Sequence, residues 1–376
     1  MEQRICHVST VHPASDARIY AKEALTLARA GYAVTLVAVE REEDYSQHVR
    51  VLQLPAQSSR LGRIFGLQWR AWWLALRTGA QAYHLHDPEL LPVGIALSIV
   101  SRVAVVYDAH EDYPAHMKHK SWIRPCFRQI AYSAIRATEK LAARTLSAVV
   151  VPTEPLAERF RRWGAKTVVL RNFPVMEVDD RTLAVPCKQY DVIHVGSLSM
   201  ERLDFFLRCV AELERRGNSL RWCFLGVTKS IQLWGQAQLA SRGLASRVSF
   251  LDPVPHSQVG AFLRLSRLGI SHHKDEARFR VALPVKVLEY MKEGIPVVAS
   301  RMPLLESLPG MEKAARLVEP EDARGFSEAI QAILTDCGIE TAMGDAGKRA
   351  VAASLNWEYE SERLVFLYQE LLGGSC

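Results

Sequence analysis

The sequence predicts an α/β protein with two Rossmann-like, doubly wound domains that face a central cleft. Its 376 residues exceed one ordinary hydrophobic core. Short apolar strands alternate with amphipathic helices, which is typical of parallel sheets covered on both faces. The alternation breaks once, in a proline-interrupted stretch, and then restarts. We therefore expect a first domain at 1–172, a linker at 173–190, a second domain at 191–356, and a closing helix at 357–376 that returns towards the first domain.

Each expected strand of the first domain is a short β-branched run, and each expected helix repeats apolar residues at a helical spacing. Gly31 ends the first helix, as glycine commonly does. In chain order we expect strand Arg4–Ser9, helix Ile19–Ala30, strands Ala33–Val39 and Val49–Leu54, helix Gln68–Arg77, strand Ala82–His86, helix Leu90–Val100, strand Val103–Tyr107, helix Trp122–Leu146, and strands Ala148–Pro152 and Thr167–Leu170.

The second domain repeats this alternation without a sequence repeat that can be aligned. We expect strand Asp191–Val195, helix Leu203–Arg215, strand Leu220–Leu225, helix Ile231–Arg242, strand Arg247–Leu251, helix His256–Leu265, strand Leu268–His272, helix Val285–Lys292, strand Ile295–Ser300, helix Ala323–Leu334 and the closing helix Trp357–Leu372.

Composition excludes several protein classes. Hydrophobic residues make up 49% and charged residues 23% of the chain, which excludes a disordered or collagen-like protein. No charge-free apolar run reaches the roughly 18–20 residues of a membrane span, and no basic segment followed by an apolar one opens the sequence. We therefore expect neither a transmembrane helix nor a secretory signal. The seven cysteines are dispersed without a C-x-x-C pair, which favours reduced cytoplasmic thiols over disulfides or a zinc site.

The positive charge is concentrated in the first half. Residues 1–172 contain 23 Lys and Arg against 15 Asp and Glu, whereas the remainder contains 24 against 26. Two stretches, Arg60–Arg77 and His116–Lys140, mix basic and aromatic residues, which suits the surface of an anionic membrane. The alternative is that the Trp side chains pack on the sheet while the arginines face water. No nucleic-acid-binding module is recognisable, and we expect no nucleic-acid partner.

The loop after the first strand carries polar residues in place of glycines. It lacks the G-x-G-x-x-G pattern that lets backbone approach a pyrophosphate, which counts against a dinucleotide-dependent dehydrogenase. His12, Asp16 and Arg18 lie there, at the carboxyl end of a strand, where α/β sheets bind ligands. They are candidate substrate contacts. Alternatively, Asp16 caps the following helix and Arg18 is solvated or forms a salt bridge.

Two further strands end in histidine and carboxylate. His86 and Asp87 follow one of them, and Asp108, His110 and Glu111 follow the next. We expect both groups at one edge of the sheet, as an acceptor-side site in which Asp108 and Glu111 orient the ring of His110. The alternative is structural hydrogen bonding. These residue types suit zinc, but no H-E-x-x-H or Cys/His spacing accompanies them, and we expect no metal.

Two segments of the second half suit an anion. Gly196, Ser197 and Arg202 span a strand–turn–helix junction, whose free N–H groups and positive helix end favour phosphate. Further along, Lys286 and Glu289 are three residues apart and share one face near the start of a helix. A lysine and a glutamate in that position can hold a phosphate and a diol. The alternative is a surface ion pair.

The run PVKVLEYMKEGIPVVAS, at residues 284–300, resembles the donor-binding helix of retaining GT-B glycosyltransferases of glycosyltransferase family 4, in a P-x-K-x-x-E-Y-M variant. Other segments resemble this family in the same order, so that the resemblance covers nearly the whole chain. They are HVSTVHPASDARIYAKEALTLARAGYAVTLV, HLHDPELLP, VYDAHEDYP, VPTEPLAERF with RNFP, VGSLSMERLDFFL and NWEYESERLVFLYQELL.

The resemblance implies a role for each matching residue. Glu289 would bind the ribose, Arg202 and Lys286 would face the diphosphate, and Gly196 would let backbone approach it. His110 would lie beside the transferred sugar, which makes His110, Arg202 and Lys286 the expected catalytic residues. The implied reaction is metal-independent hexosyl transfer, with retention, from a nucleotide sugar, most often a UDP-sugar, to a lipid-linked or saccharide acceptor of cell-surface polysaccharide or glycoconjugate synthesis. The nucleotide sugar is a substrate, so no cofactor is expected.

Two positions depart from the family pattern. Ser197 stands where many relatives carry arginine, and Val281 stands where many carry a glutamate that contacts the donor sugar. Two other functions therefore stay open: a sugar-nucleotide epimerase on the same fold, and a GT-B pseudoenzyme that binds a nucleotide or a partner. We expect a cytoplasmic protein that is peripheral on the inner face of the cell membrane.

Overall fold

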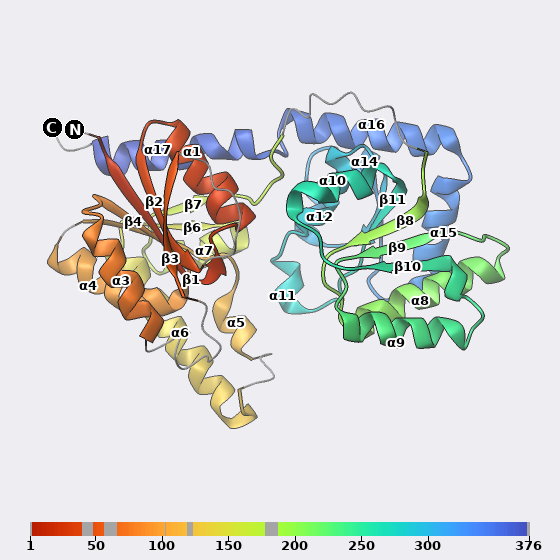
Figure 1. Ribbon diagram of the computed structural model, residues 1–376, viewed down its shortest axis with the longest axis horizontal. Coiled ribbons are helices and arrows are strands. Elements are labelled where there is room, and N and C mark those ends of the chain that lie inside the picture. Colours follow the sequence, from red (N-terminus) through yellow and green to blue (C-terminus); the bar gives the residue numbers. More distant parts are fainter. Residues whose placement is uncertain are drawn as a thin grey trace. The chain divides into compact units, whose positions relative to one another are not determined.

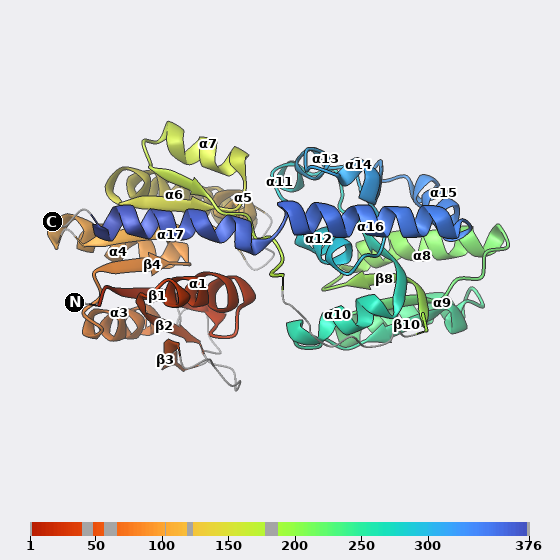
Figure 2. The ribbon, with the colours of Figure 1, turned by 90° about the horizontal axis from the view of Figure 1, so that it is seen from above.

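The computed structural model describes residues 2–39, 48–55, 66–101, 103–118, 123–176 and 187–373. The chain divides into two compact units, each built on one parallel sheet (Figures 1 and 2). Unit 1 comprises Met1–Asn172 and Trp357–Cys376, and unit 2 comprises Phe173–Asn356. Within the expected linker, residues 177–186 lie outside the described part of the chain. The predicted α/β class, with two doubly wound parallel sheets, is confirmed.

The sheet of unit 1 has seven parallel strands within the described residues, in the order β3-β2-β1-β4-β5-β6-β7. The order turns back between β1 and β4, which makes this pair the topological switch point, where such sheets bind ligands. The strands are β1 (Arg4–Pro13), β2 (Ala33–Val39), β3 (Val49–Leu54), β4 (Ala82–Leu85), β5 (Ala104–Asp108), β6 (Ala148–Val151) and β7 (Thr167–Val169).

Helices cover both faces of this sheet. In Figure 1, α3, α4 and α6 lie below the sheet and α1 and α17 above it. The final helix packs against the first one, and Trp357 Nε1 donates a hydrogen bond to Thr26 Oγ1 at 2.9 Å. The helices of unit 1 are η1 (Ala17–Ala24, a π-helix), α1 (Leu25–Arg29), α3 (Gln68–Arg77), η3 (Pro88–Leu90), α4 (Leu91–Val100), α5 (Tyr113–Met117), α6 (Pro125–Thr145), α7 (Glu154–Arg162) and α17 (Trp357–Gly373).

The tryptophans of α3 are only partly packed on the sheet, and membrane contact of this helix stays a prediction. Trp72 of α3 is buried and packs against Tyr83 of β4, whereas Trp69 and Trp73 are 69% and 51% exposed. Residues 60–65 and 119–122, which belong to the two basic–aromatic stretches, lie outside the described residues. Within the described part of the chain, no helix is long and apolar enough to cross a membrane.

Unit 2 repeats the strand order of unit 1. Six parallel strands of the described residues run in the order β10-β9-β8-β11-β12-β13, so that the switch point lies between β8 and β11. The strands are β8 (Tyr190–Val195), β9 (Trp222–Leu225), β10 (Val248–Leu251), β11 (Ser266–Ser271), β12 (Val297–Ser300) and β13 (Ala315–Val318). One hydrophobic core lies on each face, formed with α8, α9 and α15 on one side and with α10, α12 and α14 on the other.

The helices of unit 2 are α8 (Met200–Arg215), α9 (Lys229–Ala240), η4 (Ala245–Arg247), α10 (His256–Arg264), α11 (Ala277–Arg280), α12 (Val285–Lys292), α13 (Pro303–Glu306), α14 (Met311–Ala314), α15 (Ala323–Leu334) and α16 (Cys337–Ala353). The sequence predicted most of the longer ones to within a few residues but missed α16. Its contact face contains Gly344 and Gly347, which lie against the Gly294 carbonyl and Met291. These glycines interrupt the apolar face of α16, which weakens its helical pattern in the sequence.

The charge asymmetry changes when the units are counted as they fold. Because the acidic closing helix belongs to unit 1, this unit contains 24 Lys and Arg against 19 Asp and Glu. Unit 2 contains 23 against 22. Unit 1 is still the more basic unit. Division of the sequence at residue 172 had suggested an acidic second half, but unit 2 as it folds is not acidic.

Candidate active site

The turn after β8 brings backbone close to a buried lysine. Gly196 follows β8 with φ of 99°, a conformation that favours glycine. A Cβ at this position would lie 3.5 Å from Lys286 Nζ, and a Cβ on the neighbouring Gly226 would lie 3.4 Å from the Cα of Gly196. Ser197 is exposed. Gly196 N itself donates a hydrogen bond to Leu225 O at 2.8 Å, and the turn that follows leads into the N-terminus of α8 next to a cation, a setting that favours phosphate.

Helices α8 and α12 are both anchored at this switch point. Ser199 caps α8, since its hydroxyl accepts a hydrogen bond from Arg202 N at 3.3 Å. Tyr290 of α12 is fully buried, and its hydroxyl accepts a hydrogen bond from Val195 N at 3.0 Å and donates one to Ile270 O at 3.2 Å. One side chain therefore ties α12 to β8 and β11 together, which fixes the position of Lys286.

Two cations of this site have no anionic partner. Among the described residues, no hydrogen bond reaches the buried Nε and Nη2 atoms of Arg202, and neither Arg202 nor Lys286 forms an ion pair. Lys286 Nζ lies 3.5 Å from His194 Nε2. Burial, aided by the charge of Arg202, lowers the pKa of Lys286 to about 7. Burial also lowers the pKa of Arg202 and, with the two cations, those of His194 and His273. The site therefore carries positive charge that no acidic side chain of the described residues neutralises.

Glu289 lies one turn further along α12. Its side chain is 18% exposed, and its Oε1 atom lies 3.8 Å from His256 Nε2. Within the described part of the chain, Lys286 and Glu289 form no ion pair with each other, so the surface-pair alternative is not observed. Both side chains remain available to a ligand.

The corresponding edge of unit 1 is a paired network. Arg18 and Asp108 are buried and form a bidentate pair, with Nε–Oδ2 at 2.8 Å and Nη2–Oδ1 at 2.9 Å. Arg18 Nη1 also donates to Leu170 O at 3.1 Å. Burial alone would raise the pKa of Asp108, but Arg18 and His110 hold it well below its usual range. The guanidinium of Arg18 is thus paired inside unit 1, as the salt-bridge alternative expects, and its role as a substrate contact stays a prediction.

Histidines lie around this pair at the sheet edge. His110 Nε2 lies 2.9 Å from Asp108 Oδ2, and its ring centroid is 4.9 Å from that of His12. His12 Nδ1 lies 3.4 Å from Asp16 Oδ2. Burial disfavours a charged His12, but Asp16 and Asp87 outweigh burial and raise its pKa.

Backbone and side-chain bonds fix the remaining carboxylates. Asp16 caps η1, since its Oδ1 accepts hydrogen bonds from the N–H groups of Arg18 and Ile19. Asp87 Oδ2 accepts hydrogen bonds from Ser9 Oγ at 2.9 Å and from Thr10 N at 2.7 Å. These bonds pre-position the loop after β1.

One predicted member does not join this group. Glu111 pairs with His116 at 2.7 Å rather than orienting His110, so Asp108 alone of the two predicted carboxylates contacts that ring. The structure brings together the other predicted residues of this edge: His12, Asp16, Arg18, His86, Asp87, Asp108 and His110.

Sequence reasoning missed several residues of both edges. His194 and Tyr290 stand in segments that read as a buried strand and the apolar side of a helix. Buried strand histidines in unit 1 were missed for the same reason: His7 and His84 lie within otherwise apolar runs. The available signal was a histidine inside a strand that is otherwise entirely apolar.

Two family models match the chain. The model described as Glycosyltransferase Family 4 matches residues 18–173, and the model described as Glycosyl transferases group 1 matches residues 189–336. The chain carries both domains of a GT-B glycosyltransferase. The first model falls on unit 1 and the second on unit 2. The predicted GT-B fold is confirmed by the strand orders and by structures of the same fold.

Individual proteins agree with this assignment. The D-inositol 3-phosphate glycosyltransferase of Corynebacterium urealyticum is 28% identical over 129 residues, which is 34% of this chain and 29% of that protein. The match thus spans under a third of that relative's length. Sucrose-phosphate synthase of Thermosynechococcus elongatus shares the fold with a TM-score of 0.75 at 19% identity, over 100% of both chains. HepE of Anabaena, in complex with UDP and glucose, has a TM-score of 0.67 at 16% identity, over 98% of this chain and 100% of HepE.

Proposed function

We propose that this GT-B glycosyltransferase moves a hexose from a UDP-sugar to a saccharide or lipid-linked acceptor, with retention, in the synthesis of a cell-surface polysaccharide or glycoconjugate. One observation carries the proposal. Arg202 and Lys286 are largely buried at the switch point of unit 2, without an anionic partner among the described residues. Two unpaired cations beside a glycine turn at a helix N-terminus match a diphosphate in charge and in hydrogen-bonding capacity.

The cations also suit the chemistry of sugar departure. As the bond to the sugar breaks, negative charge grows on the β-phosphate, and preorganised positive groups there stabilise the transition state. Arg202 and Lys286 supply that charge, so the proposed reaction needs no metal at the phosphates. The proposed transfer is a front-face reaction, in which the leaving phosphate accepts the proton of the acceptor hydroxyl and no covalent glycosyl-enzyme forms.

The other residues have separate proposed roles. Glu289 binds the ribose hydroxyls, since its carboxylate is partly exposed on the same helix as Lys286. In unit 1, His110 lies beside the transferred sugar, and Asp108 fixes its ring. His12, Asp16 and Asp87 form the acceptor side around it. HepE supports the choice of UDP, because that protein of the same fold is in complex with UDP and glucose.

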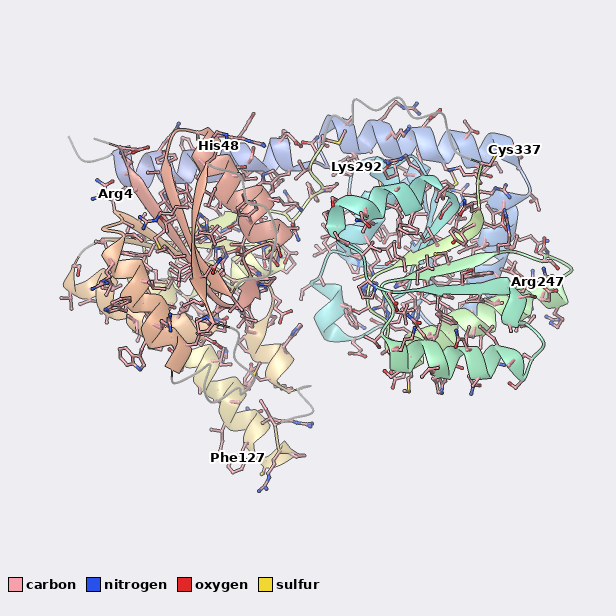
Figure 3. The ribbon with its side chains drawn as sticks, in the orientation of Figure 1. Arg4, His48, Phe127, Arg247, Lys292 and Cys337 are labelled. Atoms are coloured by element: carbon pink, nitrogen blue, oxygen red, sulfur yellow. The ribbon has the colours of Figure 1, made fainter. Side chains whose placement is uncertain are left out.

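Exposed apolar side chains support a membrane-associated acceptor. Large hydrophobic residues are exposed on the three helices that cover one face of unit 1, and Phe127 lies at the far end of α6 (Figure 3). Arg77 stacks over Trp73 at 3.8 Å, an arrangement that suits an anionic interface. We propose that this face contacts an anionic membrane. Its apolar members are Trp69, Trp73, Leu76, Ile99, Val100, Phe127, Ile130 and Leu141.

A nucleotide-release assay tests the transferase proposal. The chain is incubated with a panel of nucleotide sugars, with and without saccharide or lipid-linked acceptors. We expect release of UDP and a glycosylated product only when acceptor is present. An altered sugar without nucleotide release would instead indicate an epimerase, and binding with neither outcome would indicate a pseudoenzyme. Either result would overturn the transferase.

Co-sedimentation with vesicles tests the membrane contact. We expect binding to vesicles that contain anionic lipid, weaker binding at high salt, and little binding to zwitterionic vesicles. A Trp69→Ala, Trp73→Ala double variant should bind less, whereas Trp234→Ala in unit 2 is the control. Equal binding of wild type to both kinds of vesicle would contradict the proposal.

A further inference from the structure

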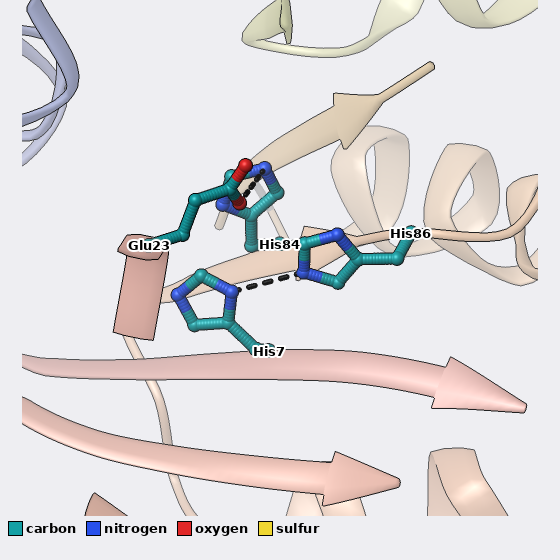
Figure 4. Close-up of side chains that lie close together, drawn as sticks. All are labelled: His7, Glu23, His84 and His86. Carbon is teal, nitrogen blue, oxygen red and sulfur yellow. Dashed lines mark hydrogen bonds and ion pairs between the residues drawn. The ribbon is translucent and has the colours of Figure 1, made fainter. Parts of the chain in front are cut away.

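A second cluster of side chains lies in the interior of unit 1, beneath the acceptor-side group. His7 of β1, Glu23 of η1, His84 of β4 and His86 just beyond β4 meet there (Figure 4). All four side chains are fully buried. Each offers one nitrogen or oxygen atom, and these atoms all lie within 4.8 Å of one another.

The sheet itself assembles this cluster. His7 and His84 are register partners on the neighbouring parallel strands β1 and β4. His86 lies two residues beyond His84, and the three rings lie within about 5 Å of one another, at centroid distances of 4.7, 4.7 and 5.2 Å. The π-helix η1 crosses the same face and brings Glu23 to them. Four groups that are distant in sequence thus converge on one point.

Most of the polar atoms of the cluster lack a hydrogen-bond partner. Among the described residues, no hydrogen bond reaches either oxygen of Glu23, either ring nitrogen of His84, or Nε2 of His7. Buried polar atoms without partners are costly and rare in folded proteins. Imidazole nitrogen is the commonest side-chain ligand of metal ions, so a bound ion would satisfy nitrogen and oxygen atoms that otherwise lack a partner.

We propose that His7, Glu23, His84 and His86 hold a structural Zn²⁺ ion inside unit 1. Three imidazole nitrogens and one carboxylate oxygen complete a tetrahedral set of the ligand types that zinc takes. His7 Nδ1 and His86 Nε2 share a hydrogen bond at 3.0 Å, which two metal–nitrogen bonds would replace; this separation is close to the ~3.3 Å between two nitrogens that each lie ~2.0–2.1 Å from a tetrahedral ion. His84 Nε2 and Glu23 Oε2 are 3.8 Å apart, which a shift of a few tenths of an ångström would close.

The surroundings of the cluster fit this assignment. Arg18 Nε lies 3.1 Å from Glu23 Oε1, and the other carboxylate oxygen faces His84. A second group, His86, Asp108 and His110, also lies within metal-binding distance. Asp108, however, already accepts two of the three guanidinium hydrogen bonds of Arg18, whereas the oxygens of Glu23 accept none within the described residues. The first group is therefore the better site.

The ion would also act on the proposed acceptor side. With Nε2 on the metal, His86 keeps its proton on Nδ1, which lies 3.2 Å from His110 Nε2 and 3.5 Å from Asp108 Oδ2. Zinc would thereby fix the tautomer of His86, whose ring contacts His110. This consequence rests on the proposed function, whereas the metal site itself does not.

Metal content after refolding tests the site directly. Because the cluster is closed, the ion enters as the unit folds, and loading must be coupled to refolding. The full chain is unfolded with a chelator and refolded with or without Zn²⁺, followed by gel filtration and elemental analysis. We expect about one zinc per chain and a melting temperature that rises with Zn²⁺ concentration.

Three variants separate ligation from folding. His84→Phe should lose the zinc, His84→Cys should keep it because a thiolate can replace imidazole, and His116→Gln, outside the cluster, should bind like wild type. If His84→Phe does not fold, wild type and His84→Cys decide the question. Wild type that refolds equally well and remains zinc-free in the presence of Zn²⁺ would overturn the proposal, as would zinc retained in His84→Phe. Neither outcome depends on transferase activity.

Discussion

The two units order their strands alike and place polar groups at the same switch point, but they treat charge in opposite ways. In unit 1, the buried Arg18 is paired with Asp108 and lies 3.1 Å from Glu23. In unit 2, Arg202 and Lys286 have no anionic partner among the described residues. A buried cation that is already paired with a carboxylate is part of the folded structure. A buried cation without a partner is stabilised when an anion binds beside it. This difference is the reason for proposing that the diphosphate binds to unit 2 and the acceptor to unit 1.

Breaking the pair in unit 1 should have the largest effect. Asp108→Ala leaves Arg18 buried without its main partner, which costs about 3–5 kcal/mol of unfolding free energy. Urea unfolding with hydrogen exchange of the β1 and β5 segments measures this loss. Glu111→Ala, which removes an exposed contact to His116, should cost about 1 kcal/mol or less. Equal losses in both variants would show that the pair is not the structural element described.

Removing a cation of unit 2 should affect turnover instead of folding. Lys286→Ala and Arg202→Ala should each lower kcat by about 10²–10³-fold, because the developing phosphate charge loses a preorganised partner. Arg215→Ala, on the same helix as Arg202 but 73% exposed, is the matched control and should leave kcat unchanged. Unchanged turnover in both site variants at saturating acceptor would refute the phosphate roles.

The pH dependence of nucleotide affinity should be intermediate in size. Lys286 has a pKa lowered to about 7, so it is mostly neutral above this pH in the free protein, and a bound diphosphate favours its charged form. Binding above pH 7 should therefore take up a proton, and affinity should fall by up to about tenfold per pH unit between pH 7 and 9. Calorimetry in buffers of different ionisation enthalpy measures the uptake. Lys286→Met should abolish it; persistence in that variant would point to another group.

The smallest expected change in stability comes from removing a helix cap, which can be compared between the two units. Asp16 caps η1 in unit 1, and Asp322 caps α15 in unit 2 by accepting a hydrogen bond from Gly325 N at 2.8 Å. Either Asp→Ala change should cost about 0.5–2 kcal/mol of stability. Only Asp16→Ala should also raise KM for the acceptor. A raised acceptor KM in Asp322→Ala would mean that the kinetic effect merely follows stability.

The fold was accessible from sequence because its signals are local. Apolar strands, helix periodicity and turn glycines placed α12 and α15 at their observed bounds, and β8 to within one residue. The chain after β12 was harder, because Gly344 and Gly347 interrupt the apolar face on which α16 packs.

The sites were only partly accessible, because pairing is a property of three dimensions. Spacing could suggest that Arg18 meets either a substrate or a carboxylate, but only the sheet brings it to Asp108, ninety residues away. The same limit applies to metal ligands. His7, Glu23 and His84 follow no sequence motif, yet strand register and one helix crossing gather them.

Calorimetric titration of UDP at pH 7 compares the two units directly, using wild type, Lys286→Met in unit 2 and His110→Ala in unit 1. We expect UDP to bind wild type and His110→Ala with the same affinity and to bind Lys286→Met at least about tenfold more weakly, since a charged hydrogen-bonding partner is worth about 1.5–3 kcal/mol. Equal affinity for all three proteins, or a loss confined to His110→Ala, would contradict the assignment of the diphosphate to the unpaired cations of unit 2.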